Sequence, residues 1–192
     1  MGHPVLTASV ELLRHTAAGV APEHLDAPTP CADWSVAQVL LHAAGDQLGW
    51  ASVVSGGPLP SYDPFAPPPE LPGGVDELIG SAVETATAAW AQVDPAEASV
   101  PTPIPPFPTL AAELAAGACA LDAAIHAWDV AVATGQDSPL TAELATRLTP
   151  AARATVEPLR GFAYAPALPA QAGDDAAAAL LRYLGRDPGW AR

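Results

Sequence analysis

Two ionisable side chains, four residues apart, stand in an otherwise apolar stretch in the second half of the chain. Asp122 and His126 lie in the run 121–129, where Ala, Leu, Ile and Trp fill most other positions. On an α-helix, residues four apart point the same way, so this carboxylate and imidazole can converge on one divalent ion. The same spacing is also typical of a weak ion pair on a half-exposed helix edge. The pair alone leaves both interpretations open.

A second predicted helix repeats this design with His42 and Asp46, again four residues apart. If the two helices are neighbours, His42, Asp122 and His126 meet as two imidazoles and a carboxylate. This donor set suits a divalent transition ion, with zinc first and iron or nickel open, and leaves a coordination position for water or substrate. Asp46 and Asp129 are then candidates to orient the ligand imidazoles from behind, although solvation explains both equally well.

Proline clusters and capping signals predict the helices that would position these side chains. Apolar residues at helical spacing predict a first helix over about 5–19. Ser35 opens a second helix through a capping box with the glutamine three residues on. A third helix is expected over about 75–93, and a fourth is expected to begin at a Thr109 cap and to stop at Gly135.

Beyond the fourth helix the sequence predicts two short helices, the second beginning at Pro150, and a last helix capped by Asp174. Alternating strand patterns and a phosphate-binding glycine loop are absent from the sequence. We therefore expect an all-α protein, an antiparallel four-helix bundle over about 5–135 with a C-terminal helical extension over about 136–192, forming a single domain.

The Pro-rich segment 55–74 separates the second and third predicted helices. A connection of this length inside a compact domain is usually functional or mobile. It is either a lid over a pocket or a poorly ordered connection.

Composition limits the partners of this protein. The chain of 192 residues has seven basic residues, all Arg, against 21 acidic ones, a formal net charge of -14. Polyanions are repelled by such a surface, so neither nucleic acid nor an anionic membrane is an expected partner. The N-terminus lacks the features of a secretory signal, and two cysteines are too few for a disulfide framework. We expect a cytoplasmic monomer or homodimer that binds a small molecule.

Three motifs follow one another along nearly the whole chain. They are the run 28–36 with Leu40-Leu41-His42, the run 125–131 with Thr134-Gly135-Gln136, and the closing run 184–190. Together they resemble the small bacterial metal-binding proteins related to the N-terminal domain of mycothiol-dependent maleylpyruvate isomerase. That family belongs to the DinB/YfiT-like four-helix bundles.

The resemblance implies a divalent metal, commonly zinc, held by a His on the second helix and an acidic residue and a His on the fourth. Those positions fall on His42, Asp122 and His126. The family pattern usually has Glu where this chain has the shorter Asp122, so a closer approach of the helices, binding through water and a weaker site are all open. The isomerase also has a C-terminal domain with no counterpart here, so its particular activity is not expected to carry over.

An open zinc site activates a bound thiol or water as a nucleophile, and in similar proteins the thiol is small, such as mycothiol. We therefore expect a metal-dependent enzyme, a thiol transferase or isomerase acting on a small electrophile. The alternatives are a non-catalytic metal- or ligand-binding module for sensing, sequestration or self-resistance, and a biosynthetic enzyme with a divergent reaction. Cys31 has no assigned base and is expected to pack at the start of the second helix.

Overall fold

The fold is known from a computed structural model, which describes residues 2–191. Within this range six α-helices are joined by loops, two short 3-10 turns and one small hairpin, so the all-α prediction is confirmed. In chain order the elements are α1 (Pro4–Ala18), η1 (Pro22–His24), α2 (Val36–Ser55), α3 (Val75–Trp90), β1 (Val100–Pro101), β2 (Thr109–Leu110), α4 (Ala112–Thr134), α5 (Ala142–Thr155), η2 (Glu157–Leu159) and α6 (Ala176–Tyr183).

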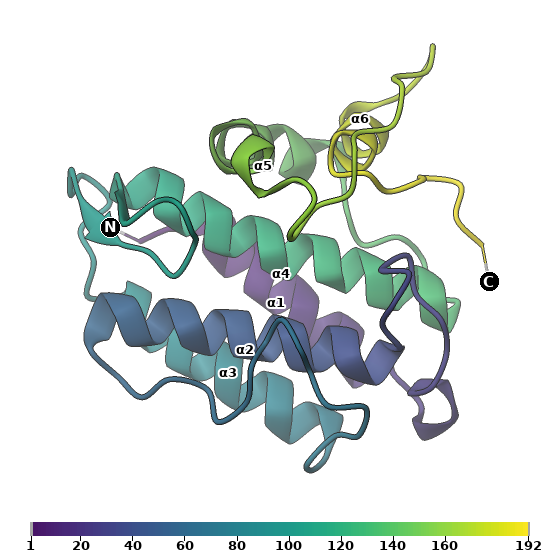
Figure 1. Cartoon of the computed structure of the whole chain (residues 1–192), viewed down its shortest axis with the longest axis horizontal. Coiled ribbons are helices and arrows are strands. Elements are labelled where there is room, and N and C mark those ends of the chain that lie inside the picture. Colours follow the sequence, from purple (N-terminus) through teal and green to yellow (C-terminus); the bar gives the residue numbers. More distant parts are fainter. Residues whose placement is uncertain (1, 192) are drawn as a thin grey trace.

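Helices α1 to α4 form a four-helix bundle in which α1 and α2 each contact both α3 and α4 (Figure 1). Contacts near the helix ends give their directions. Gln136 donates a hydrogen bond to the carbonyl oxygen of Thr16 at 3.2 Å, which brings the C-terminal ends of α1 and α4 together. The rings of Trp50 and Trp90 lie 5.7 Å apart near the C-terminal ends of α2 and α3, and His3 at the start of α1 also packs on Trp90. The pairs α1/α4 and α2/α3 are therefore parallel, and α1/α3 and α2/α4 are antiparallel, so the expected antiparallel arrangement holds for two of the four neighbouring pairs.

The parallel direction of α2 and α3 explains the long segment 56–74. A 20-residue helix such as α2 is about 30 Å long, and the chain must travel back along this length before α3 can begin in the same direction. The segment 56–74, when extended, is long enough to cover that distance. Figure 1 shows the segment returning along the bundle. Topology thus requires a long connection on the α2 side of the bundle.

The predicted signals at the start of α2 and at the end of α4 are present. The Ser35 side chain accepts from the Gln38 amide, and the Gln38 side chain accepts from the Ser35 amide, so the capping box at the start of α2 is complete. Helix α4 ends at Gly135, whose φ of 77° lies in the left-handed region that favours glycine. These local signals set where α2 begins and where α4 ends.

The start of α4 differs from the prediction. Thr109 does not cap the helix, because it lies in β2 and pairs with Pro101 of β1 in a hairpin of two-residue strands. Helix α4 begins at Ala112, after an Ala111 cap that supplies no side-chain hydrogen bond. The hairpin pairing therefore takes the position at which the sequence suggested a cap.

Two expectations for the C-terminal helices were also wrong. Pro150 does not begin a new helix but lies inside α5. The helix continues through it because Pro150 is exposed while Leu148 and Ala152 on the opposite side are buried against the rest of the protein. Asp175, not Asp174, caps α6, and Asp174 instead forms a salt bridge with Arg182 at 3.0 Å.

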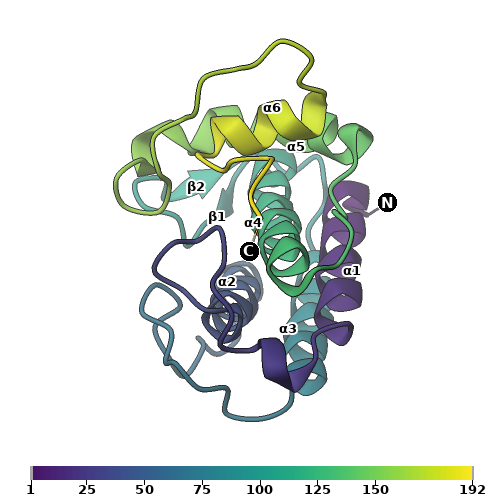
Figure 2. The same ribbon diagram turned by 90° about the vertical axis from the view of Figure 1, so that its right-hand side faces the viewer.

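Helix α4 is the central element of the core. By length and composition it is apolar enough to cross a membrane, yet 83% of its most apolar window is buried inside the protein. Such burial is that of a core helix. On its outer side α5 packs against α4, and α6 packs against α5, so the C-terminal extension forms a layer beside the bundle (Figure 2).

Gly117 permits the close approach of α5 to α4. A Cβ atom at this position would lie 2.9 Å from the Cβ atom of Ala151, closer than two such atoms pack. Gly80, inside α3, has no neighbour within 4 Å of its would-be Cβ atom.

We predict that Gly117→Ala lowers the free energy of unfolding by about 1–3 kcal/mol, because overpacking outweighs the gain in helix propensity. The matched change Gly80→Ala raises the same quantity by about 0.5–1 kcal/mol, because it meets no obstacle. Urea unfolding followed by circular dichroism measures both. Equal stabilisation by the two changes would show that α5 does not depend on this contact.

Candidate metal centre

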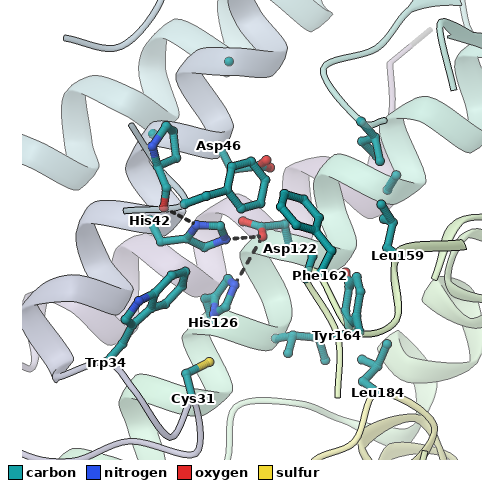
Figure 3. A pocket seen from close by; sticks show the side chains of 18 of the residues that line it. Cys31, Trp34, His42, Asp46, Asp122, His126, Leu159, Phe162, Tyr164 and Leu184 are labelled. Atoms are coloured by element: carbon teal, nitrogen blue, oxygen red, sulfur yellow. Dashed lines mark hydrogen bonds and ion pairs between the residues drawn. The ribbon is translucent and has the colours of Figure 1, made fainter. Parts of the chain in front are cut away.

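The three predicted ligands come together where α2 and α4 lie side by side (Figure 3). The Nε2 atoms of His42 and His126 each lie 3.3 Å from the same oxygen, Oδ1 of Asp122. The donor atoms of all three residues lie within 4.8 Å of one another. Because α2 and α4 are antiparallel neighbours, one residue from α2 and two from α4, one turn apart, meet at one point.

The spacing of these atoms fits a small tetrahedral ion. Donor atoms bound to zinc at about 2.0–2.1 Å in tetrahedral geometry are separated by about 3.3–3.4 Å. The distances from Asp122 to both imidazoles match this separation. The other oxygen of Asp122, Oδ2, is buried and has no hydrogen-bond partner among residues 2–191. The shorter side chain of Asp122 therefore does reach both imidazoles.

Each imidazole is held through its other nitrogen. His42 Nδ1 lies 2.8 Å from the carbonyl oxygen of Pro64, an acceptor, so Nδ1 carries the proton and donates it. His126 Nδ1 lies 2.9 Å from Oδ2 of Asp129. Hydrogen bonds of this kind fix the ring orientation and leave Nε2 free for a metal. Both rings thus present Nε2 to the same point.

The charges around this point perturb one another. Burial alone would raise the pKa of Asp122, but His126 and His42 outweigh it and hold the pKa below its usual range. Burial alone would lower the pKa of His126, but Asp122 and Asp129 outweigh it and raise the pKa well above its usual value. Without an ion, the cluster therefore has the character of a buried ion pair.

Asp129 is fully buried and is held by Arg186 from the C-terminal extension. Arg186 donates from Nε to Oδ1 and from Nη2 to Oδ2, both at 2.8 Å. Burial would raise the pKa of Asp129, but the guanidinium outweighs it and lowers the pKa. Cys31 completes this cluster, with its sulfur 3.2 Å from Asp129 Oδ2 and 3.3 Å from Arg186 Nη2. Cys31 was expected to pack at the start of α2. Its sulfur instead contacts Asp129 of α4 and Arg186 of the C-terminal extension.

Cys31, His126 and Asp129 form a second group with donor atoms close enough for an ion. Arg186 already occupies both oxygens of Asp129 and contacts the sulfur. A second cation between them would meet the guanidinium charge at short range. The first group, which has no cationic side chain bound to its carboxylate other than its own imidazoles, is the better candidate for a metal site.

The two carboxylates expected behind the imidazoles differ in their contacts. Asp129 bonds to His126, as described above. Asp46 makes no hydrogen bond to an imidazole within residues 2–191, and the carbonyl of Pro64 orients His42 in its place. The Oδ2 atom of Asp46 is buried without a partner, and burial followed by repulsion from Asp122 raises the pKa of Asp46 well above its usual value.

A cavity of about 830 Å³ opens beside the three residues. Its wall combines the bundle, the segment 56–74 and the C-terminal extension with the loops at 30–34 and 103–105. Aromatic and aliphatic side chains form much of this wall, among them Phe65 and Ile125. Figure 3 labels four others, Trp34, Leu159, Phe162 and Leu184. The volume is that of a small-molecule site.

Sequence reasoning did not find three groups that shape this site. Pro64 acts through a backbone oxygen, which any residue would offer, so no side-chain signal exists. Arg186 is 57 residues from its partner Asp129, and its place in the closing motif 184–190 was the available hint. Cys31 likewise lies in one of the three motifs, but its contacts with Asp129 and Arg186 were not predicted.

A four-helix bundle with two imidazoles and a carboxylate facing a cavity defines the class of helical proteins that can hold a metal between helices. The mycothiol maleylpyruvate isomerase N-terminal domain family matches residues 6–131, and the chain belongs to this family, which is part of the DinB-like metal-binding helical superfamily. Two uncharacterised proteins of Mycobacterium tuberculosis, from strains CDC 1551 / Oshkosh and H37Rv, are each 32% identical over 144 residues, covering 73% of this chain and 71% of the relative. No solved structure matches the chain.

We predict that Asp129→Asn lowers the free energy of unfolding by about 3–5 kcal/mol, because it leaves Arg186 buried without a counter-charge. The control is Glu11→Gln in the exposed pair with Arg14, for which the change is below about 1 kcal/mol. Chemical unfolding of both variants in metal-free buffer measures the difference. Losses of similar size in the two variants would contradict the role given to the buried pair.

Proposed function

We propose that this protein binds a divalent metal ion through His42, Asp122 and His126, with zinc as the ion that best suits these donors. One observation carries the proposal: two imidazoles held from behind aim Nε2 at one oxygen of a buried carboxylate. The tetrahedral spacing and the unpartnered Oδ2 of Asp122 support it. Membership of a metal-binding superfamily supports it independently.

We further propose that the protein is an enzyme that transfers a low-molecular-weight thiol of the mycothiol type, or water, to a small electrophile, or isomerises such a substrate. When bound, the ion supplies Lewis-acid activation of the thiol or water. Pro64 and Asp129 keep the two imidazoles in one orientation. The cavity leaves room for a substrate beside them, and the apolar part of its wall can hold an apolar substrate.

Charge also supports small molecules as the partners. Seven basic against 21 acidic residues disfavour nucleic acids and anionic membranes. We propose that the protein acts in the cytoplasm on soluble compounds.

Metal analysis tests the first step. We expect purified protein, loaded with zinc and passed through a desalting column, to keep about one ion per chain, as one three-ligand site predicts. His126→Ala should lose the ion, because two ligands hold zinc poorly. The control His15→Ala changes an exposed residue of α1 and should keep it. A parent protein without bound metal would end the proposal.

A turnover assay separates an enzyme from a binding module. We expect zinc-loaded protein to accelerate the reaction of mycothiol or N-acetylcysteine with a chloronitrobenzene or an epoxide, and His126→Ala to return the rate to the uncatalysed value. Saturable binding of the thiol without product would instead identify a module for sensing or sequestration.

A further inference from the structure

The cavity beside the three candidate ligands has an unusual balance of charge. Among the described residues, its wall contains the carboxylates of Asp33 and Asp122 and the carboxyl group of Asp46, whose pKa is raised, and Arg186 is its one permanently charged cation. Arg186 is already committed, because both oxygens of Asp129 accept its hydrogen bonds at 2.8 Å. A carboxylate ligand entering this space would lose its water without gaining an uncommitted cation in the wall.

The apolar part of the wall offers a surface for an uncharged ring or chain. Phe65 from the segment 56–74 and Phe162 from the loop after η2 lie with their ring centroids 5.1 Å apart. Both are partly exposed, at 44% and 65%, and both line the cavity. Two partly exposed aromatic rings from separate loops are costly in water and favourable beside an apolar ligand.

Asp46 supplies the polar contact that such a ligand would need. It lies one helical turn after His42 and lines the same cavity, and its Oδ2 atom is buried without a partner in the part of the chain that the structure describes. A buried carboxyl oxygen without a hydrogen bond is destabilising. A hydroxyl or amino group on a ligand would satisfy it.

We propose that the cavity takes an uncharged, mainly apolar substrate with one hydroxyl or amino group, which hydrogen-bonds to Asp46 while its apolar body packs on Phe65 and Phe162. In the metal-free protein, a ligand with a free carboxylate is disfavoured, because the wall offers it no uncommitted cation. This names the substrate class of the proposed enzyme and rests on that function only in assigning the cavity to the reaction, since binding itself requires no metal.

The test compares three probes with one ring system: naphthalenemethanol, methylnaphthalene and naphthoate. Their binding to the full chain is followed by ligand-observed NMR, with and without zinc. We expect the alcohol to bind about tenfold tighter than the methyl compound, and naphthoate to bind at least about tenfold more weakly than the alcohol in metal-free protein. Naphthoate binding as tightly as the alcohol, or no binding of any probe, overturns the proposal.

Variants assign the effect to Asp46. Asp46→Ala should reduce the preference for the alcohol over the methyl compound to below about twofold, and Asp46→Asn, which keeps a hydrogen-bonding group of the same shape, should preserve it. The control Asp33→Ala removes an exposed carboxylate from the same cavity wall and should leave the preference unchanged. A preference that survives in Asp46→Ala overturns the proposal.

Thermal unfolding is the check that the variants fold. Loss of the buried, unpartnered carboxyl of Asp46 is not expected to destabilise the protein. The outcome is separable from that of the metal proposal. A protein that binds no metal but shows the probe preference refutes only the proposed enzyme, whereas a metal-binding protein that favours naphthoate when metal-free refutes only the substrate class.

Discussion

The buried ion pair between Asp129 and Arg186 is the interaction on which the candidate site depends. Asp129 is fully buried in α4, and a lone carboxylate there would be too costly to keep ionised. The guanidinium of Arg186 makes the charge tolerable, and the ionised carboxylate can then hold His126 in one orientation. The C-terminal extension therefore does more than cover the bundle, because it supplies the charge that sets the direction of a candidate ligand.

The same logic applies on the α2 side with a different group. His42 is oriented by a backbone carbonyl at Pro64, which has no charge and lies in a segment outside the helices. Gly45 permits the close approach of this segment, since a Cβ atom there would lie 2.8 Å from Pro64. The two imidazoles thus come from the bundle, but His42 is oriented by a segment outside it, and the Asp129 that orients His126 is neutralised by Arg186 of the C-terminal extension. Bundle, return segment and extension meet at one place.

The sequence contained enough local information to predict the helices and the three converging residues. The capping box at Ser35, the stop at Gly135 and the spacing of Asp122 and His126 are all readable within a few residues. The predictions that failed are those for which tertiary contacts override a local signal. The helix continues through Pro150 because its neighbours are buried. Thr109 pairs with β1, and strands of two residues are too short to be recognised from the sequence. Arg186 and Pro64 act through tertiary contacts, which no local pattern encodes.

The parallel course of α2 and α3 has an evolutionary consequence. The chain must run back outside the bundle, so a stretch of about the length of α2 takes no part in the packing of the four helices on one another. In this protein that stretch carries Phe65 and the carbonyl that faces His42. Proteins with this fold can therefore acquire new ligand preferences through changes in the segment 56–74, while the four helices and their polar residues stay as they are.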